Sequence, residues 1–101
     1  MTIAKQDVYE FLATIPKGKV VTYGQIGEHF GNKHYAQAIG NYLHENPDGD
    51  KYPCYKVVNR DGKLAPQYAF GGLNAQKARL EADGIAVVNG KVDLKKYRYN
   101  P

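Results

Sequence analysis

The chain has 101 residues, of which 43% are hydrophobic, and this predicts one domain with one modest core. A single cysteine excludes an internal disulfide and favours a reducing, cytoplasmic location, and no apolar run is long enough to cross a membrane. The net charge of +4, with 14 Lys and Arg against 10 Asp and Glu, suits a nucleic-acid partner without proving one.

The first predicted element is an amphipathic helix over about residues 2–13. Its apolar side chains recur at the three- and four-residue spacing of a helix, at Val8, Phe11, Leu12 and Ile15. The sequence Pro16-Lys17-Gly18-Lys19 then predicts a turn, and Val20-Val21 predicts a short extended pair.

Two short helices joined by a glycine turn come next, and together they predict a helix-turn-helix. Thr22 and Gln25 match the capping box, in which a Thr side chain caps the helix and a Gln three residues later reaches back. We expect this helix to end at Phe30, before Gly31, and a second helix to cover residues 33–44. An ordinary helical hairpin in the core would explain the same pattern equally well.

Two hairpins and one helix are predicted beyond the loop at residues 46–50. Residues 56–58 and 63–64 would pair across a turn, and Asn89-Gly90 between apolar runs favours a type I′ turn. The helix would cover residues 73–82, with Leu73, Gln76 and Leu80 one turn apart and Gly84 beyond its end. Residues 94–99 alternate basic and aromatic side chains, which could lie on a phosphate backbone, but we expect a frayed, solvated end.

The sole cysteine, Cys54, follows a proline and leads into Val57-Val58. Proline restricts its own φ and the conformation of the preceding residue, so we expect Cys54 at a rigid turn that enters a strand. Lys56 would favour the thiolate over the thiol. A lone cysteine is more often a small buried apolar residue, but both flanks of this one favour a chemical role.

Metal and cofactor sites are not predicted. His29, His34 and His44 lie in or beside the predicted helices and form no paired ligand spacing with Cys54. Gly71-Gly72 lacks the spacing and the lysine of a nucleotide-binding loop.

Several short motifs occur in one characteristic order: Ile15-Pro16-Lys17-Gly18, Val21-Thr22-Tyr23-Gly24, Ala38-Ile39-Gly40, Asn46-Pro47, Pro53-Cys54 and Gly71-Gly72. With these motifs the chain resembles, from Val8 to Gly84, the DNA-binding domain of the alkylguanine-DNA alkyltransferases, the methylated-DNA–protein-cysteine methyltransferases. The resemblance implies a mainly α, winged helix-turn-helix fold with small β-hairpins. In that family the damaged guanine is flipped out of the duplex, and a Pro-Cys-His-Arg-Val cysteine accepts its alkyl group once.

The resemblance also implies roles for individual residues. Cys54 would accept the alkyl group, and Tyr23 would press against the phosphate of the flipped nucleotide. Residues 33–44 would form the recognition helix, and Asn46 would connect that helix to the cysteine turn. The DNA-binding residues would be Thr22, Tyr23, Lys33, Ala36, Gln37, Gly40, Asn41, Lys56 and Arg60. The lesion pocket would be lined by Tyr23, Pro53, Cys54, Val57, Ala69 and Phe70.

Five positions depart from the family pattern. Tyr55 replaces the histidine that helps to remove the thiol proton, and with a reference pKa of about 10 a tyrosine is a poor proton acceptor. Asp83 is one methylene shorter than the glutamate that orients that histidine. Gln37 replaces the arginine that fills the space left by the flipped base, and Phe70 replaces a small or hydroxyl side chain. Lys56 keeps the charge of the motif arginine but loses its planar fork.

Three functions remain open at this stage. The first is a monomeric, stoichiometric alkyltransferase that acts on double-stranded DNA containing alkylated guanine, with Cys54, Tyr55, Asp83 and Asn46 as its catalytic set. The second is a sensor that binds the lesion and recruits other repair proteins, as in the alkyltransferase-like branch, whose members lack the cysteine. The third is a winged-helix regulator without any preference for damaged DNA.

Overall fold

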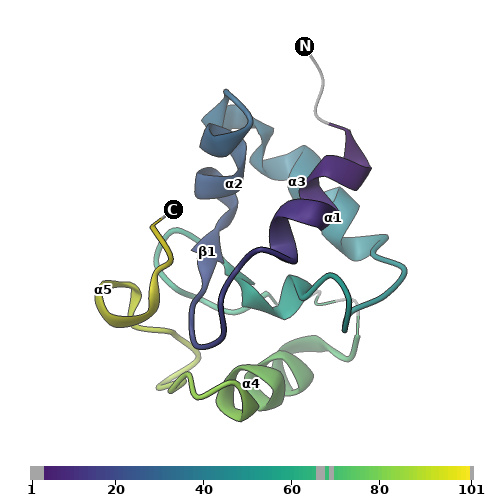
Figure 1. The fold of residues 1–101 in the computed structure, drawn as a ribbon. Coiled ribbons are helices and arrows are strands. Elements are labelled where there is room, and N and C mark those ends of the chain that lie inside the picture. Colours follow the sequence, from purple (N-terminus) through teal and green to yellow (C-terminus); the bar gives the residue numbers. More distant parts are fainter. Residues whose placement is uncertain (1–3, 66–67, 69, 101) are drawn as a thin grey trace.

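The computed structural model describes residues 4–65, 68 and 70–100, apart from the side chain of Lys33. Helices α1, α2 and α3 are grouped at one end of the molecule and α4 lies at the other, with the residues around Cys54 between them (Figure 1). The elements are α1 (Lys5–Leu12), β1 (Val21–Thr22), α2 (Tyr23–His29), η1 (Lys33–Tyr35), α3 (Ala36–His44), η2 (Cys54–Lys56), β2 (Val57–Val58), α4 (Gly72–Ala82) and α5 (Leu94–Tyr97). No helix among the described residues combines the length and the apolar character needed to cross a bilayer.

The helix-turn-helix forms as predicted, with one change at the start of its second helix. Thr22 Oγ1 accepts a hydrogen bond from the Gln25 amide at 3.1 Å, and Gln25 Oε1 accepts one from the Thr22 amide at 3.0 Å, so the capping box is confirmed. The expected helix over residues 33–44 is divided into the 3-10 turn η1 and α3. Asn32 Oδ1 accepts from the His34 amide at 2.8 Å, which caps that tighter first turn.

The small sheet pairs strands that are far apart in the sequence. Strands β1 and β2 are parallel, with Val21 opposite Val57 and Thr22 opposite Val58. The predicted pairing of residues 56–58 with residues 63–64 is therefore wrong. Asn59 Oδ1 accepts from the amides of Asp61 and Lys63 at 2.9 and 2.8 Å, which folds this stretch into a tight turn. The valines are at most 1% exposed, which is typical of a parallel sheet covered on both faces.

The predicted hairpin at Asn89-Gly90 is confirmed. Val88 and Lys91 exchange hydrogen bonds of 2.9 and 3.1 Å, and Asn89 and Gly90 have φ values of 53° and 74°. A type I′ turn requires positive φ at both central positions, and Asn followed by Gly adopts it at the lowest cost. This hairpin packs beside the 59–63 turn through a bridge between Lys63 and Lys91.

The expectation of a frayed C-terminal end is wrong. Asp93 caps α5 by accepting a hydrogen bond from the Lys95 amide at 3.0 Å. The Val20 amide then donates to the Tyr97 carbonyl at 2.8 Å, and the Tyr99 amide donates to the Val20 carbonyl at 2.8 Å. Residues 97–99 are fixed because the backbone N–H and C=O of Val20, next to β1, need partners and find them there.

Candidate functional site

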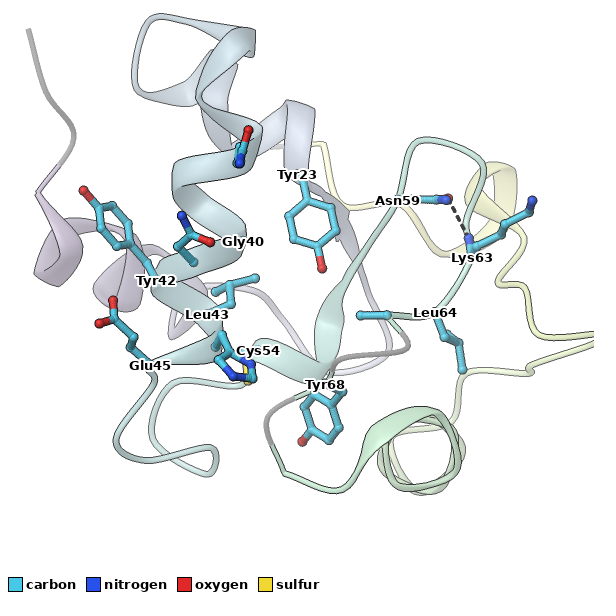
Figure 2. A pocket seen from close by; sticks show the side chains of 14 residues that line it. Tyr23, Gly40, Tyr42, Leu43, Glu45, Cys54, Asn59, Lys63, Leu64 and Tyr68 are labelled. Carbon is cyan, nitrogen blue, oxygen red and sulfur yellow. Dashed lines mark hydrogen bonds between the residues drawn. The ribbon is translucent and has the colours of Figure 1, made fainter.

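One cavity of about 940 Å³ brings the helix-turn-helix and the cysteine together, and we call it the cysteine pocket. Figure 2 shows Tyr23, Leu43 and Cys54 around it, with Leu64 and Tyr68 on the facing side. The helix-turn-helix contributes Tyr23, Gln37, Gly40, Asn41, Tyr42, Leu43, His44 and Glu45. The cysteine turn contributes Cys54, and the segment after β2 contributes Asn59, Lys63, Leu64, Ala65 and Tyr68.

Cys54 lies in the 3-10 turn η2 and is 4% exposed. Its amide donates to the Tyr52 carbonyl at 2.7 Å, which fixes the turn. Burial raises the pKa of the Cys54 thiol because a thiolate is poorly solvated there. A hydrogen bond from the Asn46 side chain and the positive charge of Arg79 act in the opposite direction on this pKa. Cys54 lines the cysteine pocket. Because its pKa is raised, the thiol is mostly protonated at neutral pH.

Asn46 connects α3 to the cysteine turn. Its Nδ2 donates to the Tyr52 carbonyl at 2.7 Å, and its Oδ1 accepts from the Asp48 amide at 3.0 Å. Asn46 lies directly after Glu45, the C-cap of α3, so it links the end of that helix to the residues before Cys54. Its catalytic role stays a prediction.

Tyr55 occupies the position of the family's histidine, and its surroundings keep it neutral. Burial raises the pKa of its hydroxyl first, and the negative charge of Asp83 raises it further. The Arg79 guanidinium lies over the ring, 4.8 Å from its centroid. Tyr55 therefore packs as a neutral aromatic side chain, and its place in the catalytic set stays a prediction.

Lys56 and Asp83 form a buried structural contact. Lys56 Nζ donates to the carbonyls of Ile15 and Pro16 at 3.1 Å each and lies 3.6 Å from Asp83 Oδ2. The same carboxylate oxygen accepts from the Gly18 amide at 2.9 Å. The predictions that Lys56 contacts DNA and favours the Cys54 thiolate are wrong, because a flexible ammonium reaches these inward-facing oxygens. Asp83 stabilises the Pro16–Lys19 turn through its contacts with Gly18 and Lys56, and its place in the catalytic set stays a prediction.

The remaining predicted residues are distributed around the site. Thr22 is buried as the α2 cap, Ala36 is half-buried at the start of α3, and Lys33 opens η1. Pro53 is half-buried beside Cys54, and Arg60 is exposed on the turn after β2.

Three residues that were predicted to line the pocket are not part of its lining, namely Pro53, Val57 and Phe70. Val57 is 1% exposed within the sheet, and Phe70 is 41% exposed with its ring edge-on to Tyr68, so neither lines the cysteine pocket. Val57 is drawn into the core because β2 pairs with β1. Ala69 lies outside the described residues.

Sequence reasoning missed the role of Gln76, which joins the backbone on two sides of the cysteine pocket. Gln76 is fully buried on α4, and its Nε2 donates to the carbonyls of Tyr55 and Val57 at 3.0 and 3.1 Å. Its Oε1 accepts from the Ala65 amide at 2.7 Å. The cysteine turn and the facing pocket segment are thus joined by one side chain. A polar residue between Leu73 and Leu80, one turn from each, was the available signal.

Tyr68 was also missed as a pocket residue. Its side chain is 7% exposed, and its hydroxyl has no hydrogen-bond partner among the described residues. Burial raises the pKa of Tyr68 to about 12, with a further contribution from Cys54. The described residues contain no group of three or more His, Cys, Asp and Glu side chains that could bind a metal ion.

Comparison with known proteins agrees with this arrangement. Residues 4–85 match the family model for the 6-O-methylguanine DNA methyltransferase, DNA binding domain. The chain is 42% identical over 93 residues to a bifunctional methyltransferase/endonuclease of Picrophilus torridus, covering 92% of this chain but only 30% of that protein. It is 40% identical to a DNA base-flipping protein of Vibrio parahaemolyticus, covering 93% of each chain.

A solved structure matches over the full length of both chains. It is Atl1 of S. pombe in complex with damaged DNA containing O6-carboxymethylguanine, with a TM-score of 0.88 and 29% sequence identity. The agreement therefore extends over the whole of this mainly helical fold. From the matched residues and the shared fold together, the chain belongs to the family of the 6-O-methylguanine DNA methyltransferase DNA-binding domain.

Proposed function

We propose that the protein binds duplex DNA containing alkylated guanine, takes the flipped base into the cysteine pocket and slowly transfers the alkyl group to Cys54. The observation that carries this proposal is that the thiol of Cys54 and the exposed side chains of α3 line the same cavity. A base must leave the duplex before an atom on it can be reached by a protein nucleophile. The cavity accommodates a base beside the only cysteine.

The proposed chemistry is a direct displacement at the alkyl carbon. The Cys54 thiolate forms the new S–C bond as the bond from that carbon to guanine O6 breaks. The electron pair of the broken bond remains on the guanine, which takes up a proton from solvent, and the thiol proton is released to solvent. The product is a stable thioether, so each protein molecule reacts once.

Intact-mass measurement tests this proposal. After incubation with duplex DNA containing O6-methylguanine, the protein should gain the mass of one CH₂ unit, since a methyl group replaces the thiol hydrogen. Peptide mapping should place the gain on Cys54. An unchanged mass at complete binding of the duplex would contradict transfer.

The rate of transfer should rise steeply with pH. Only the thiolate reacts, and burial raises the pKa of Cys54 above its ordinary value, so the reactive fraction at neutral pH is small. We expect the single-turnover rate constant to increase about tenfold per pH unit from about pH 7 upward, until the thiol is titrated. Binding of the duplex, measured at each pH, should change far less. A flat rate profile over this range would contradict rate limitation by the thiolate.

A lesion sensor that does not transfer the alkyl group is the second candidate. It is favoured by the neutral, packed state of Tyr55, which leaves Cys54 without the neighbouring base of the family motif. Preferential binding of alkylated over plain duplex, with no mass gain on the protein, would establish this function. Equal binding of both duplexes would favour a regulator without a preference for damage.

Gln37 is predicted to act at the space left by the flipped base. It is exposed on α3 and lines the cysteine pocket, where its amide can form hydrogen bonds but lacks the reach and charge of an arginine. Gln37→Arg should therefore tighten binding to the lesion duplex more than to plain duplex, by competition titration. Asn41→Arg is the matched control, since it adds the same charge one turn later on α3. Equal gains for the two variants would assign the effect to charge alone.

A further inference from the structure

A second hollow of about 570 Å³ lies beyond the 59–63 turn, and we call it the tail groove. Arg60 and Asp61 line one side of it, and all its other lining residues come from residues 86–97. The groove is thus built largely from a segment that follows the family match to residues 4–85. That segment is fixed in place by the backbone bonds of Tyr97 and Tyr99 with Val20.

The tail groove has an excess of positive charge. Its lining includes the four cations Arg60, Lys91, Lys95 and Lys96 against the two carboxylates of Asp61 and Asp93. All four cationic side chains are exposed, and none forms an ion pair with another described residue.

Some cations elsewhere in the described chain are paired with carboxylates, whereas others form no ion pair with a described residue either, namely Lys17, Lys19, Lys51, Lys63 and Arg98. Lys5 pairs with Glu45, Lys77 pairs with Glu81, and Arg79 pairs with Asp50, at 3.3, 3.4 and 2.9 Å respectively. The groove is distinguished by the gathering of four such unpaired cations around one hollow with only two carboxylates, which favours an anionic ligand.

Residues of a single turn line both the tail groove and the cysteine pocket. Asn59 and Lys63 of that turn line the pocket (Figure 2), whereas Arg60 and Asp61 line the groove. The Val92 amide donates to the Gly62 carbonyl at 2.8 Å, so the turn and the C-terminal hairpin form one unit. This turn therefore lies between the cysteine pocket and the tail groove.

We propose that the tail groove binds backbone phosphates of the duplex on one side of the lesion. This inference rests on the proposed function for the presence of DNA at the pocket. The phosphates of B-DNA present about one negative charge per 1.7 Å of helix axis, so the exposed lysines of the groove can contact more than one phosphate without reading sequence. The groove extends the contact surface beyond the helix-turn-helix and stabilises the complex whatever the flanking sequence.

The test compares two variants that lose the same charge. Lys91→Gln/Lys95→Gln removes two cations from the groove, and Lys5→Gln/Lys77→Gln removes two that are already paired with carboxylates. Affinity is measured over a salt series with two duplexes of about 20 base pairs, longer than the roughly 11 base pairs spanned by the 37 Å of the protein at 3.4 Å per pair. One duplex has O6-methylguanine near the 5′ end of its strand, and the other has it near the 3′ end.

The groove variant should bind one of the two duplexes about tenfold more weakly at low salt and the other almost normally, because only one places its long flank over the groove. On that duplex the slope of log affinity against log salt should become shallower by about 1 to 2 units. The control variant should lose little on either duplex, and all variants should retain the thermal transition of the native chain.

Equal losses for the groove and control variants, or equal losses of the groove variant on both duplexes, would overturn the proposal. Unchanged DNA affinity would also overturn it and would leave the groove to an acidic protein partner. Failure of lesion binding is distinguishable, since the native chain would then bind alkylated and plain duplexes equally, and failure of transfer alone would leave the mass of the protein unchanged. The groove and control variants would then be compared on plain duplex. That comparison would still test the phosphate contacts, because they do not require a lesion.

Discussion

Replacing Tyr55 by histidine is expected to raise the rate of alkyl transfer to Cys54 by about 10², the low end of the usual range for general-base assistance. An imidazole next to Cys54 could accept the thiol proton directly or through one water. The guanidinium of Arg79, which lies over the present ring, would favour the neutral form of the imidazole that can accept a proton. The gain should remain modest because Asp83, already bonded to Lys56 and Gly18, is not available to orient the new side chain.

Single-turnover transfer to duplex DNA containing O6-methylguanine measures this effect, with two variants as controls. Tyr55→Phe keeps an aromatic ring but supplies no base, so its rate should stay close to that of the native chain. Tyr55→His/Cys54→Ala should transfer nothing while still binding the lesion. If neither the native chain nor Tyr55→His becomes alkylated, Cys54 is a pocket-lining residue of a lesion sensor.

Lys56→Met is expected to destabilise the fold by about 3–5 kcal/mol, the usual cost of removing one partner from a buried ion pair. The ammonium of Lys56 also satisfies the carbonyls of Ile15 and Pro16, which the thioether of methionine cannot do. Chemical denaturation at neutral pH measures the change in the free energy of unfolding.

The matched control for Lys56 is Lys77→Met, which makes the same substitution at the exposed pair of Lys77 with Glu81. This control should cost less than about 1 kcal/mol, since exposed ion pairs contribute little. Similar losses for both variants would mean that the Lys56 contact is no more important than a surface pair. The expected difference would agree with a structural role for Lys56, which is 5% exposed.

Local chemistry made parts of this fold predictable from the sequence. The capping box at Thr22 and Gln25 and the Asn89-Gly90 turn each depend on residues within four positions of one another. Signals of this kind act before any tertiary contact exists, so the sequence alone contains them. The same is true of the restricted turn around Pro53 and Cys54.

Contacts between distant segments could not be predicted in this way. Strand β2 pairs with β1, which lies 36 positions earlier in the sequence. The local pattern instead predicted a hairpin between residues 56–58 and the nearby residues 63–64. Lys56 points inward because its ammonium donates to the carbonyls of Ile15 and Pro16, which follow α1 and lie about 40 positions earlier in the sequence. Gln76 acquires its role only when α4 meets both sides of the cysteine pocket. Such arrangements depend on the assembled core, which no local pattern encodes.

The docking of Tyr97 and Tyr99 on Val20 has a consequence for the order in which the chain folds. Helices α1, α2 and α3 are consecutive in the sequence and can pack while the ribosome is still adding later residues. The backbone of Val20, in contrast, finds its partners only when residues 97–99 have emerged from the ribosome. During synthesis the edge beside β1 therefore stays open, and a chain halted before Tyr97 would present it to other nascent chains.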